Sequence, residues 1–216
     1  MKSKRRLLQG SRLYLVADAG VLEHRRASGF IRRVRAAGID MIQLRDKVSS
    51  RRVILKNVRE LRNLLAKTNT LLIVNDHVDI ARFSASDGVH LGQNDISTAV
   101  ARALLGPEAI IGRSTHSLAQ AREAVAGGAD YISIGPVFAT ATKPEYRPVG
   151  LRLARQVAKE IKIPVFAIGG LDRETIPRLD HSGIRRIAVC GAICRAKKPA
   201  AEAKALKRML ASFNKS

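Results

Sequence analysis

Apolar residues gather into eight short runs along the chain, separated by longer stretches in which apolar and polar positions are interspersed. The runs cover residues 13–16, 39–44, 71–74, 88–91, 109–112, 131–134, 164–168 and 184–189. Most of them do not alternate regularly between apolar and polar residues, which is typical of parallel β-strands that are buried on both faces. We therefore predict a strand at each run.

The segments between the runs have the spacing of amphipathic helices. Their apolar residues recur at three- and four-residue steps, as in Val53, Leu61 and Leu65, or in Ala203, Leu206, Leu210 and Phe213. Such spacing buries one face of a helix. Strands that alternate with helices favour a parallel sheet, and repeated units of this kind favour its closure. The predicted fold class is α/β, with the architecture of a (β/α)8 TIM barrel.

Length and composition fit this fold. The chain has 216 residues, 46% of them hydrophobic, and no change of composition marks a second domain. We expect one barrel domain over residues 1–216, with a basic extension at residues 1–10. No run of about 18 apolar residues is present to span a membrane, and residues 1–10 lack the apolar core of a secretory signal. The expected location is the cytoplasm, without a membrane partner.

The cysteine content and the charge bear on two other possibilities, a structural zinc site and nucleic-acid binding. The two cysteines, Cys190 and Cys194, have no second pair to complete a structural zinc site. The net charge is +21, and most cations fall between the apolar positions of predicted helices, as expected of a solvated outer surface. Non-specific attraction of polyanions such as RNA is the alternative. Because aromatic residues are only 4% and Trp is absent, we expect no specific nucleic-acid partner.

Polar clusters follow the predicted strands, and in a barrel all strand C-termini open onto one face. Gln43, Arg45 and Lys47 alternate at the end of the second run, so their side chains point to one side. Two cations and an amide donor together suit a phosphate or a diphosphate. A solvated basic strand end is the alternative for this cluster taken alone.

Carboxylates end the next two strands. Asn75 and Asp76 follow the third run, and Asp95 follows the fourth. Two carboxylates on adjacent loops fit a Mg²⁺ ion that bridges the protein and phosphate oxygens. The alternative is that Asp76 caps a helix starting at His77 and Asp95 caps one starting at Ile96. Each capping role is plausible singly, but the clustering with basic residues favours a metal.

The loops after the sixth, seventh and eighth runs contain further residues suited to binding phosphate. A long loop after the sixth run contains Thr140, Thr142 and Lys143, which offer two hydroxyls and an ammonium to an anion. Loops of this length in compact domains usually have a role, here as a lid that excludes water. Gly170 and Gly191 follow the seventh and eighth runs, where barrels commonly bind phosphate through backbone N–H groups. Simple turn formation is the alternative for each glycine.

These motifs together resemble the thiamine phosphate synthase family. The resemblance runs from Leu13 to about Ile193 and is carried by QLRDK, NDHVDIA, DGVHLGQND, IGRSTHS, YISIGPVFATATKP and AIGG. It implies a transferase that condenses 4-amino-5-hydroxymethyl-2-methylpyrimidine diphosphate with 4-methyl-5-(2-hydroxyethyl)thiazole phosphate. The products are thiamine phosphate and diphosphate, formed by a Mg²⁺-assisted dissociative substitution.

The resemblance also implies roles for individual residues. Those implied to hold the pyrimidine diphosphate are Gln43, Arg45, Lys47, Asn75 and Lys143, and those implied to hold Mg²⁺ are Asp76 and Asp95. The catalytic positions are Lys143 and Ser114, with Ser114 near the departing diphosphate. The implied ligands of the thiazole phosphate are Thr140, Thr142, Gly170, Cys190 and Gly191. His90 and His116 are expected to form structural hydrogen bonds.

Some positions depart from the family pattern, and other functions stay open. Gly191 stands where Ser is common, Ala17 where Thr is common, and residues 19–30 look unlike the usual segment. A sister family, the thiazole tautomerases, has a characteristic His where this chain has Pro136. A non-catalytic barrel that binds a phosphate ligand or RNA is a third possibility. The sequence does not decide whether the chain forms a homo-oligomer.

Overall fold

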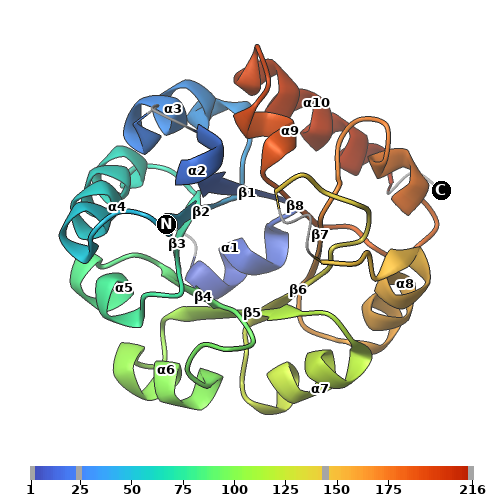
Figure 1. The fold of residues 1–216 in the computed structure, drawn as a ribbon, viewed down its shortest axis with the longest axis horizontal. Coiled ribbons are helices and arrows are strands. Elements are labelled where there is room, and N and C mark those ends of the chain that lie inside the picture. Colours follow the sequence, from blue (N-terminus) through green and yellow to red (C-terminus); the bar gives the residue numbers. More distant parts are fainter. Residues whose placement is uncertain (1–2, 23–25, 143–145, 214–216) are drawn as a thin grey trace.

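Eight parallel strands form a closed barrel in sequence order, from β1 next to β2 round to β8 next to β1. The computed structural model describes residues 3–22, 26–142 and 146–213 (Figure 1). The strands are β1 (Leu13–Asp18), β2 (Met41–Arg45), β3 (Leu71–Asn75), β4 (Gly88–Leu91), β5 (Ile110–Thr115), β6 (Tyr131–Ile134), β7 (Val165–Ile168) and β8 (Ile187–Val189). The prediction of a (β/α)8 TIM barrel is confirmed.

Some strands extend beyond the predicted apolar runs, because polar residues at their ends also take part in backbone pairing. Strand β1 continues to Asp18, which pairs in register with Arg45, and β5 continues to Thr115, which pairs with Ile134. Strand β8 begins at Ile187 rather than at residue 184. Apolar content therefore marked each strand, but backbone pairing extends into the polar residues that face the barrel mouth.

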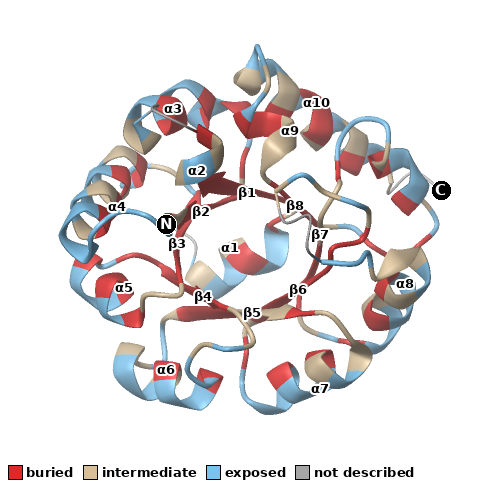
Figure 2. Ribbon diagram, viewed as in Figure 1, coloured by how far each residue is buried: buried red, intermediate tan, exposed pale blue. Residues whose placement is uncertain are grey.

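The helices surround the barrel in a ring, except the first, which lies across one end of it (Figure 1). They are α1 (Lys4–Gly10), α2 (Ala19–Leu22), α3 (Ala27–Val34), α4 (Arg51–Leu65), α5 (Val78–Ser84), α6 (Thr98–Leu105), α7 (Leu118–Ala126), α8 (Gly150–Glu160), α9 (Gly191–Cys194) and α10 (Pro199–Ser212), with short 3₁₀ helices η1 (Arg35–Ala37) and η2 (Ile176–Leu179). Their buried sides face the strands and their exposed sides face outward (Figure 2). Val53 is an exception to the predicted pattern, because it is 43% exposed while Ile54 faces the core.

Two apolar clusters fill the molecule. The larger lies between the barrel and its helices and includes Leu15, Ile42 and Leu206. The smaller, which contains Tyr14, Ile73, Tyr131, Phe166 and others, fills the inside of the barrel. Since the interior is packed, a ligand reaches only the mouth at one end.

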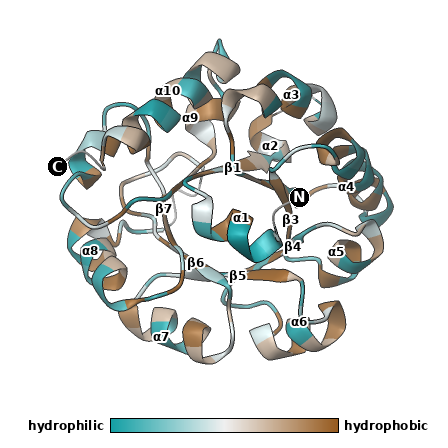
Figure 3. Ribbon diagram, turned by 180° about the vertical axis from the view of Figure 1, so that it is seen from behind, coloured by the Kyte–Doolittle hydropathy of each residue, from teal (hydrophilic) through white to brown (hydrophobic). Residues whose placement is uncertain are grey.

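The basic N-terminal segment closes the other end of the barrel. Seen from behind, α1 lies across the opening (Figure 3). Its Leu8 is 2% exposed and packs into the interior cluster. Arg5 donates hydrogen bonds to the Asp130 carboxylate and to the Pro107 carbonyl oxygen, which precede β6 and β5 respectively. No helix within the described ranges combines the length and apolar character needed to cross a membrane.

Candidate active site

A cavity of about 350 Å³ opens at the C-terminal ends of the strands. This volume is at the lower end of the range for small-molecule sites, about 300–1,000 Å³. Nine of the residues singled out from the sequence line it: Gln43, Arg45, Asn75, Ser114, Thr140, Thr142, Gly170, Cys190 and Gly191. They come from six different strand ends and loops, so the closed barrel brings them together.

A chain of hydrogen bonds crosses the floor of this cavity. Gln43 Nε2 donates to the Tyr14 hydroxyl at 2.5 Å, and the Tyr14 and Tyr131 hydroxyls lie 2.9 Å apart. The Tyr131 hydroxyl is 3.0 Å from His90 Nδ1, and His90 Nε2 is 2.9 Å from Ser114 Oγ. The expected hydrogen-bonding role of His90 is therefore observed, and the two tyrosines are members that sequence reasoning missed.

The chemistry of each group sets the direction of this chain. Because the amide nitrogen of Gln43 only donates, Tyr14 is free to donate to Tyr131, and Tyr131 to His90 Nδ1. His90 Nε2–H then donates to Ser114, whose own proton is left available to a ligand. Burial raises the pKa of both tyrosines, so both hydroxyls keep their protons. Gly112 makes room for this arrangement, since a Cβ there would lie 2.0 Å from the Tyr131 ring.

Arg45 has a buried partner that the sequence did not indicate. Its Nη1 forms an ion pair with Asp18 Oδ2, and Asp18 is only 5% exposed. Asp18 Oδ1 accepts a hydrogen bond from the backbone N–H of Val21 at 3.1 Å, which fixes the carboxylate. Arg45 lines the cavity, and its guanidinium has more N–H donors than this ion pair uses. A signal was present, because Asp18 ends the first strand.

Lys47, Asp76 and Asp95 form a cluster of their own, which is not among the residues that line the cavity but adjoins the lining residue Asn75 along the chain. Lys47 Nζ pairs with Asp76 Oδ2, and the carboxyls of Asp76 and Asp95 share a hydrogen bond. Burial opposes ionisation of Asp76, but hydrogen bonds from Lys47 and Asp95 outweigh it and lower its pKa. Burial and then the neighbouring Asp76 raise the pKa of Asp95, against a backbone hydrogen bond from Gly92.

Neither aspartate caps a helix. Helix α5 begins at Val78, its N-cap is His77, and no side chain caps it. Helix α6 begins at Thr98 and is capped by the Ser97 hydroxyl. Asp95 Oδ2 instead accepts the Gly92 N–H at 2.7 Å. The capping alternative is therefore wrong for both residues, and so are the helix starts expected at His77 and Ile96.

The donors of this cluster fit a magnesium ion. Within the described ranges, no group of three or more His, Cys, Asp and Glu side chains is placed to hold a metal. Mg²⁺ does not need one, because it usually binds one or two carboxylates and completes its shell with water and substrate phosphates. Asp76 has a left-handed backbone with φ of 60°, an unusual conformation of the kind that concentrates at functional sites.

The loop after β6 forms one wall of the cavity. Thr140 and Thr142 line it, and the Thr142 N–H donates to Thr140 Oγ1 at 3.3 Å. Val137 N–H and Phe138 N–H bond the carbonyl oxygens of Ile168 and Gly169, which ties the loop to the end of β7. Lys143, the expected catalytic cation, lies outside the described residues.

Gly170 has a structural reason to be glycine. Its φ is 62°, and a Cβ there would lie 2.4 Å from the Ala139 carbonyl oxygen. The backbone therefore approaches the β6 loop closely on that side, whereas the sequence reasoning considered approach to a ligand. Gly170 lines the cavity as well, so both contacts involve the same turn.

Cys190 and Gly191 lie where β8 passes into α9. Cys190 lines the cavity and Cys194 is buried, with its Sγ 3.6 Å from the Val16 carbonyl oxygen. Gly191 has Arg195 Nη1 and Thr142 Oγ1 as its nearest neighbours across space. The β6 loop and α9 thus converge at this side of the cavity.

His116 and Tyr146 close another side. His116 Nδ1 lies 2.5 Å from the Gly135 carbonyl oxygen, and its ring stacks on Tyr146 at 5.3 Å between centroids. The structural hydrogen bond expected of His116 is observed. Tyr146 was not identified from the sequence, because a single aromatic in a long loop gives no periodic signal.

Comparison with known proteins identifies one family. The family model described as thiamine monophosphate synthase matches residues 13–193. A thiamine-phosphate synthase of Chloroflexus aurantiacus is 38% identical over 92% of this chain and 92% of that protein. A solved structure of thiamine phosphate pyrophosphorylase from Pyrococcus furiosus superposes with a TM-score of 0.86, at 32% identity, over 97% of this chain and 98% of that chain.

Other relatives are longer than this chain. A thiamine-phosphate synthase of Prochlorococcus marinus (strain MIT 9313) is 44% identical over 93% of this chain, but the match covers 57% of that protein. The chain thus spans little more than half the length of several curated relatives that it matches.

Proposed function

We propose that this chain, which belongs to the thiamine monophosphate synthase family, is itself a synthase that joins a pyrimidine diphosphate to a thiazole phosphate. The observation that carries the proposal is the cavity in which nine residues meet, each at a position to which the family resemblance assigns a binding or catalytic role. The products are thiamine phosphate and diphosphate. Since both substrates are charged small molecules that do not cross membranes unaided, we propose a cytoplasmic reaction.

The first step is departure of the diphosphate. Gln43, Arg45 and Asn75 hold the pyrimidine diphosphate, with Lys47 and Lys143 adding positive charge. Cations aimed at the leaving group lower the barrier electrostatically, without a protein nucleophile. The Ser114 proton, oriented through His90, adds a donor near the departing oxygen. The pyrimidine-methyl cation that remains is then captured by the thiazole nitrogen.

Asp76 and Asp95 are the residues that would hold Mg²⁺. The ion would supply charge neutralisation for the diphosphate. Lys47 pairs with Asp76 in the structure, and in the complex its ammonium would turn toward the phosphate instead. The carboxylates of Asp76 and Asp95 would then be available to the ion, and the Lys47 ammonium and the Mg²⁺ would both offset the charge of the diphosphate.

The second substrate binds on the opposite side of the cavity. Thr140 and Thr142 donate hydroxyls to its phosphate, and the backbones of Gly170, Cys190 and Gly191 approach it. Ordering of the β6 loop against β7 supports this arrangement, because the threonines are already held over the cavity. Exclusion of water by the loop protects the cation from hydrolysis.

The test is direct synthesis. Purified protein is mixed with both substrates, with and without Mg²⁺, and thiamine phosphate and diphosphate are followed by chromatography. We expect product only when both substrates and Mg²⁺ are present. A folded protein that releases no product under these conditions contradicts the proposal. Isomerisation of a thiazole precursor by the same sample would indicate the tautomerase activity instead.

A further inference from the structure

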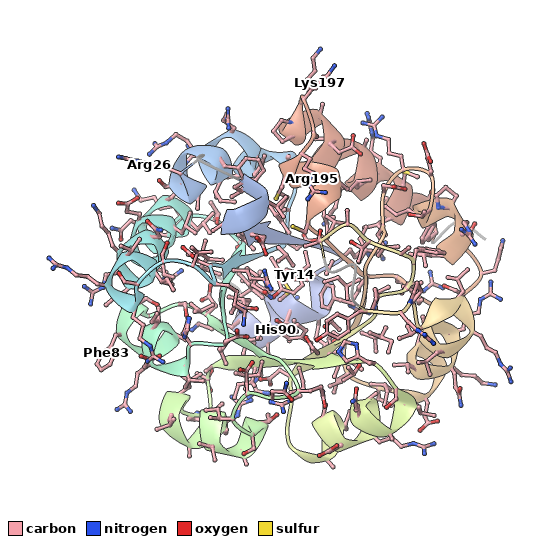
Figure 4. The ribbon with its side chains drawn as sticks, in the orientation of Figure 1. Tyr14, Arg26, Phe83, His90, Arg195 and Lys197 are labelled. Carbon is pink, nitrogen blue, oxygen red and sulfur yellow. The ribbon has the colours of Figure 1, made fainter. Side chains whose placement is uncertain are left out.

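Arg195 has no role in the site as described so far, yet it lines the same cavity. It follows directly after α9, and Figure 4 shows its side chain on the barrel side of that helix. Lys197, two residues further on, extends away from the molecule in the same view. The two cations are close in sequence, but only Arg195 is among the cavity residues.

The space beside Gly191 is where Arg195 and the β6 loop meet. A Cβ built at Gly191 would lie 3.8 Å from Arg195 Nη1 and 4.0 Å from Thr142 Oγ1. Among the described residues, and apart from the chain neighbours and the backbone of α9 itself, these are the two heavy atoms within 4 Å of that point. A guanidinium and a hydroxyl thus border a gap that a larger residue at position 191 would partly fill.

Among the residues that the structure describes, the Arg195 guanidinium takes part in no ion pair and no hydrogen bond. Two acids line the cavity with it: the buried Asp18 is paired with Arg45, and Asp172 Oδ1 accepts backbone N–H groups of its own turn. The Cys190 thiol has a lowered pKa, first through its hydrogen bond with Cys194 and also through the charge of Arg195.

We propose that the Arg195 guanidinium, together with the Thr142 hydroxyl, binds the phosphate of the thiazole substrate in the gap beside Gly191. The inference rests on the proposed function and specifies one of its binding groups. A planar guanidinium presents paired donors that match two phosphate oxygens. In this chain Arg195 therefore supplies a donor where the family commonly has the hydroxyl of a serine at position 191.

The test compares Arg195→Ala with Lys197→Ala, which removes the same charge from outside the cavity. We expect Arg195→Ala to raise the KM for thiazole phosphate about 10- to 100-fold, the usual effect of losing a hydrogen bond to a charged group. The KM for the pyrimidine diphosphate should stay unchanged. Lys197→Ala should leave both values unchanged. Equal KM values for thiazole phosphate in the two variants would overturn the proposal.

Two further variants separate phosphate binding from a structural role. Gly191→Ser in the Arg195→Ala background restores a hydroxyl at the gap, and we expect it to recover part of the lost affinity. Arg195→Lys keeps a point charge without the paired donors, so its KM should fall between those of the wild type and Arg195→Ala. Failure of both variants to improve on Arg195→Ala would overturn the phosphate contact.

Calorimetric titration with thiazole phosphate distinguishes this inference from the proposed function. If the wild type makes no thiamine phosphate, the proposed function fails, and binding alone decides the role of Arg195. Weaker binding to Arg195→Ala than to Lys197→Ala would still support the contact. Equal binding to these two variants, or no binding to the wild type, would overturn it.

Discussion

Arg45 ends β2 and Lys47 follows two residues later, yet the two cations pair with carboxylates at the ends of different neighbouring strands. Arg45 pairs with Asp18 of β1, whereas Lys47 pairs with Asp76, which follows β3. Arg45 lines the cavity and is held in place before substrate arrives, whereas Lys47 would have to exchange Asp76 for the phosphate. A cation held in place in advance stabilises a leaving diphosphate without the cost of rearrangement.

Removal of one carboxylate at the proposed metal site should abolish most turnover. We expect Asp76→Asn and Asp95→Asn each to lower kcat about 100-fold or more, since charge aimed at the leaving group is lost. Their melting temperatures should stay close to that of the wild type. Steady-state assays over a Mg²⁺ titration measure the effect.

Asp79→Asn is the matched control, because Asp79 is an exposed carboxylate that pairs with Arg51 on the surface. It should leave both turnover and Mg²⁺ dependence unchanged. Full activity of Asp76→Asn or Asp95→Asn would remove that residue from the proposed metal site.

Tyr131→Phe tests the hydrogen-bond chain under the cavity. Loss of the hydroxyl removes the hydrogen bonds that join Tyr131 to Tyr14 and to His90, which should lower the free energy of unfolding by about 1–3 kcal/mol at pH 8. Because burial raises the Tyr131 pKa, the unfolded chain ionises this group first as pH rises past about 10. The contribution of Tyr131 to the free energy of unfolding is therefore complete below about pH 10 and decreases progressively as the pH rises above it.

Urea unfolding of the wild type and Tyr131→Phe at several pH values measures this dependence. The difference between the two proteins should narrow above about pH 10. A difference that stays constant or widens at high pH would contradict a raised Tyr131 pKa. The variant should also have lower turnover, since His90 loses the partner that orients it toward Ser114.

At the level of the elements, three strands are each preceded by an aspartate that makes the same kind of hydrogen bond. Asp40, Asp87 and Asp130 precede β2, β4 and β6, and each accepts a backbone N–H from the strand before. Two of them also bind α1, through Lys4–Asp87 and Arg5–Asp130. No local sequence pattern marks these three aspartates as a repeat. Their common contact, a backbone N–H of the preceding strand, is visible only in the folded barrel.

Helix α1 should contribute to stability through one side chain above all. Leu8 packs inside the barrel at 2% exposure, so Leu8→Ala should lower the free energy of unfolding by about 2–5 kcal/mol. Leu104→Ala is the control, since Leu104 is 45% exposed and should change it by about 0.5 kcal/mol or less. Urea denaturation followed by circular dichroism measures both. Equal stability of the two variants would show that α1 does not seal the barrel.

At the scale of the whole molecule, most of the excess positive charge lies on the outer helix faces. Arg32, Arg33 and Arg52 are exposed, as expected of a solvated surface, whereas Arg186 and Lys207 are half-buried. Lys207 pairs with Asp40, and Arg186 bonds the Gln9 carbonyl oxygen. Most of the predicted cationic surface is therefore confirmed.

A surface of this kind should retain polyanions without sequence preference. With a net charge of +21, we expect RNA binding to weaken about 100-fold or more between about 50 and 200 mM salt. Two RNA homopolymers should bind equally, and Asp76→Asn should bind like the wild type. Fluorescence anisotropy at several salt concentrations measures this. Binding that resists salt or prefers one homopolymer would contradict a purely electrostatic origin.

Local sequence pattern was sufficient to locate the eight strands and most of the residues that gather at one end of the barrel. Hydrophobic period is a local property, and parallel strands that close into a barrel have all their C-termini at one face. For that reason Gln43, Ser114 and Gly191 could be assigned to one cavity before any contact was known.

Only the tertiary structure decided which side chains become partners. The Tyr14–Tyr131 contact joins residues 117 positions apart, and Arg195 reaches the Gly191 gap because α9 turns it toward Thr142. Helix capping was the alternative role for Asp76, but its left-handed backbone places it beside Lys47 and Asp95 instead. Such pairings depend on strand register and on barrel closure, which bring distant residues within hydrogen-bond distance and which no local pattern encodes.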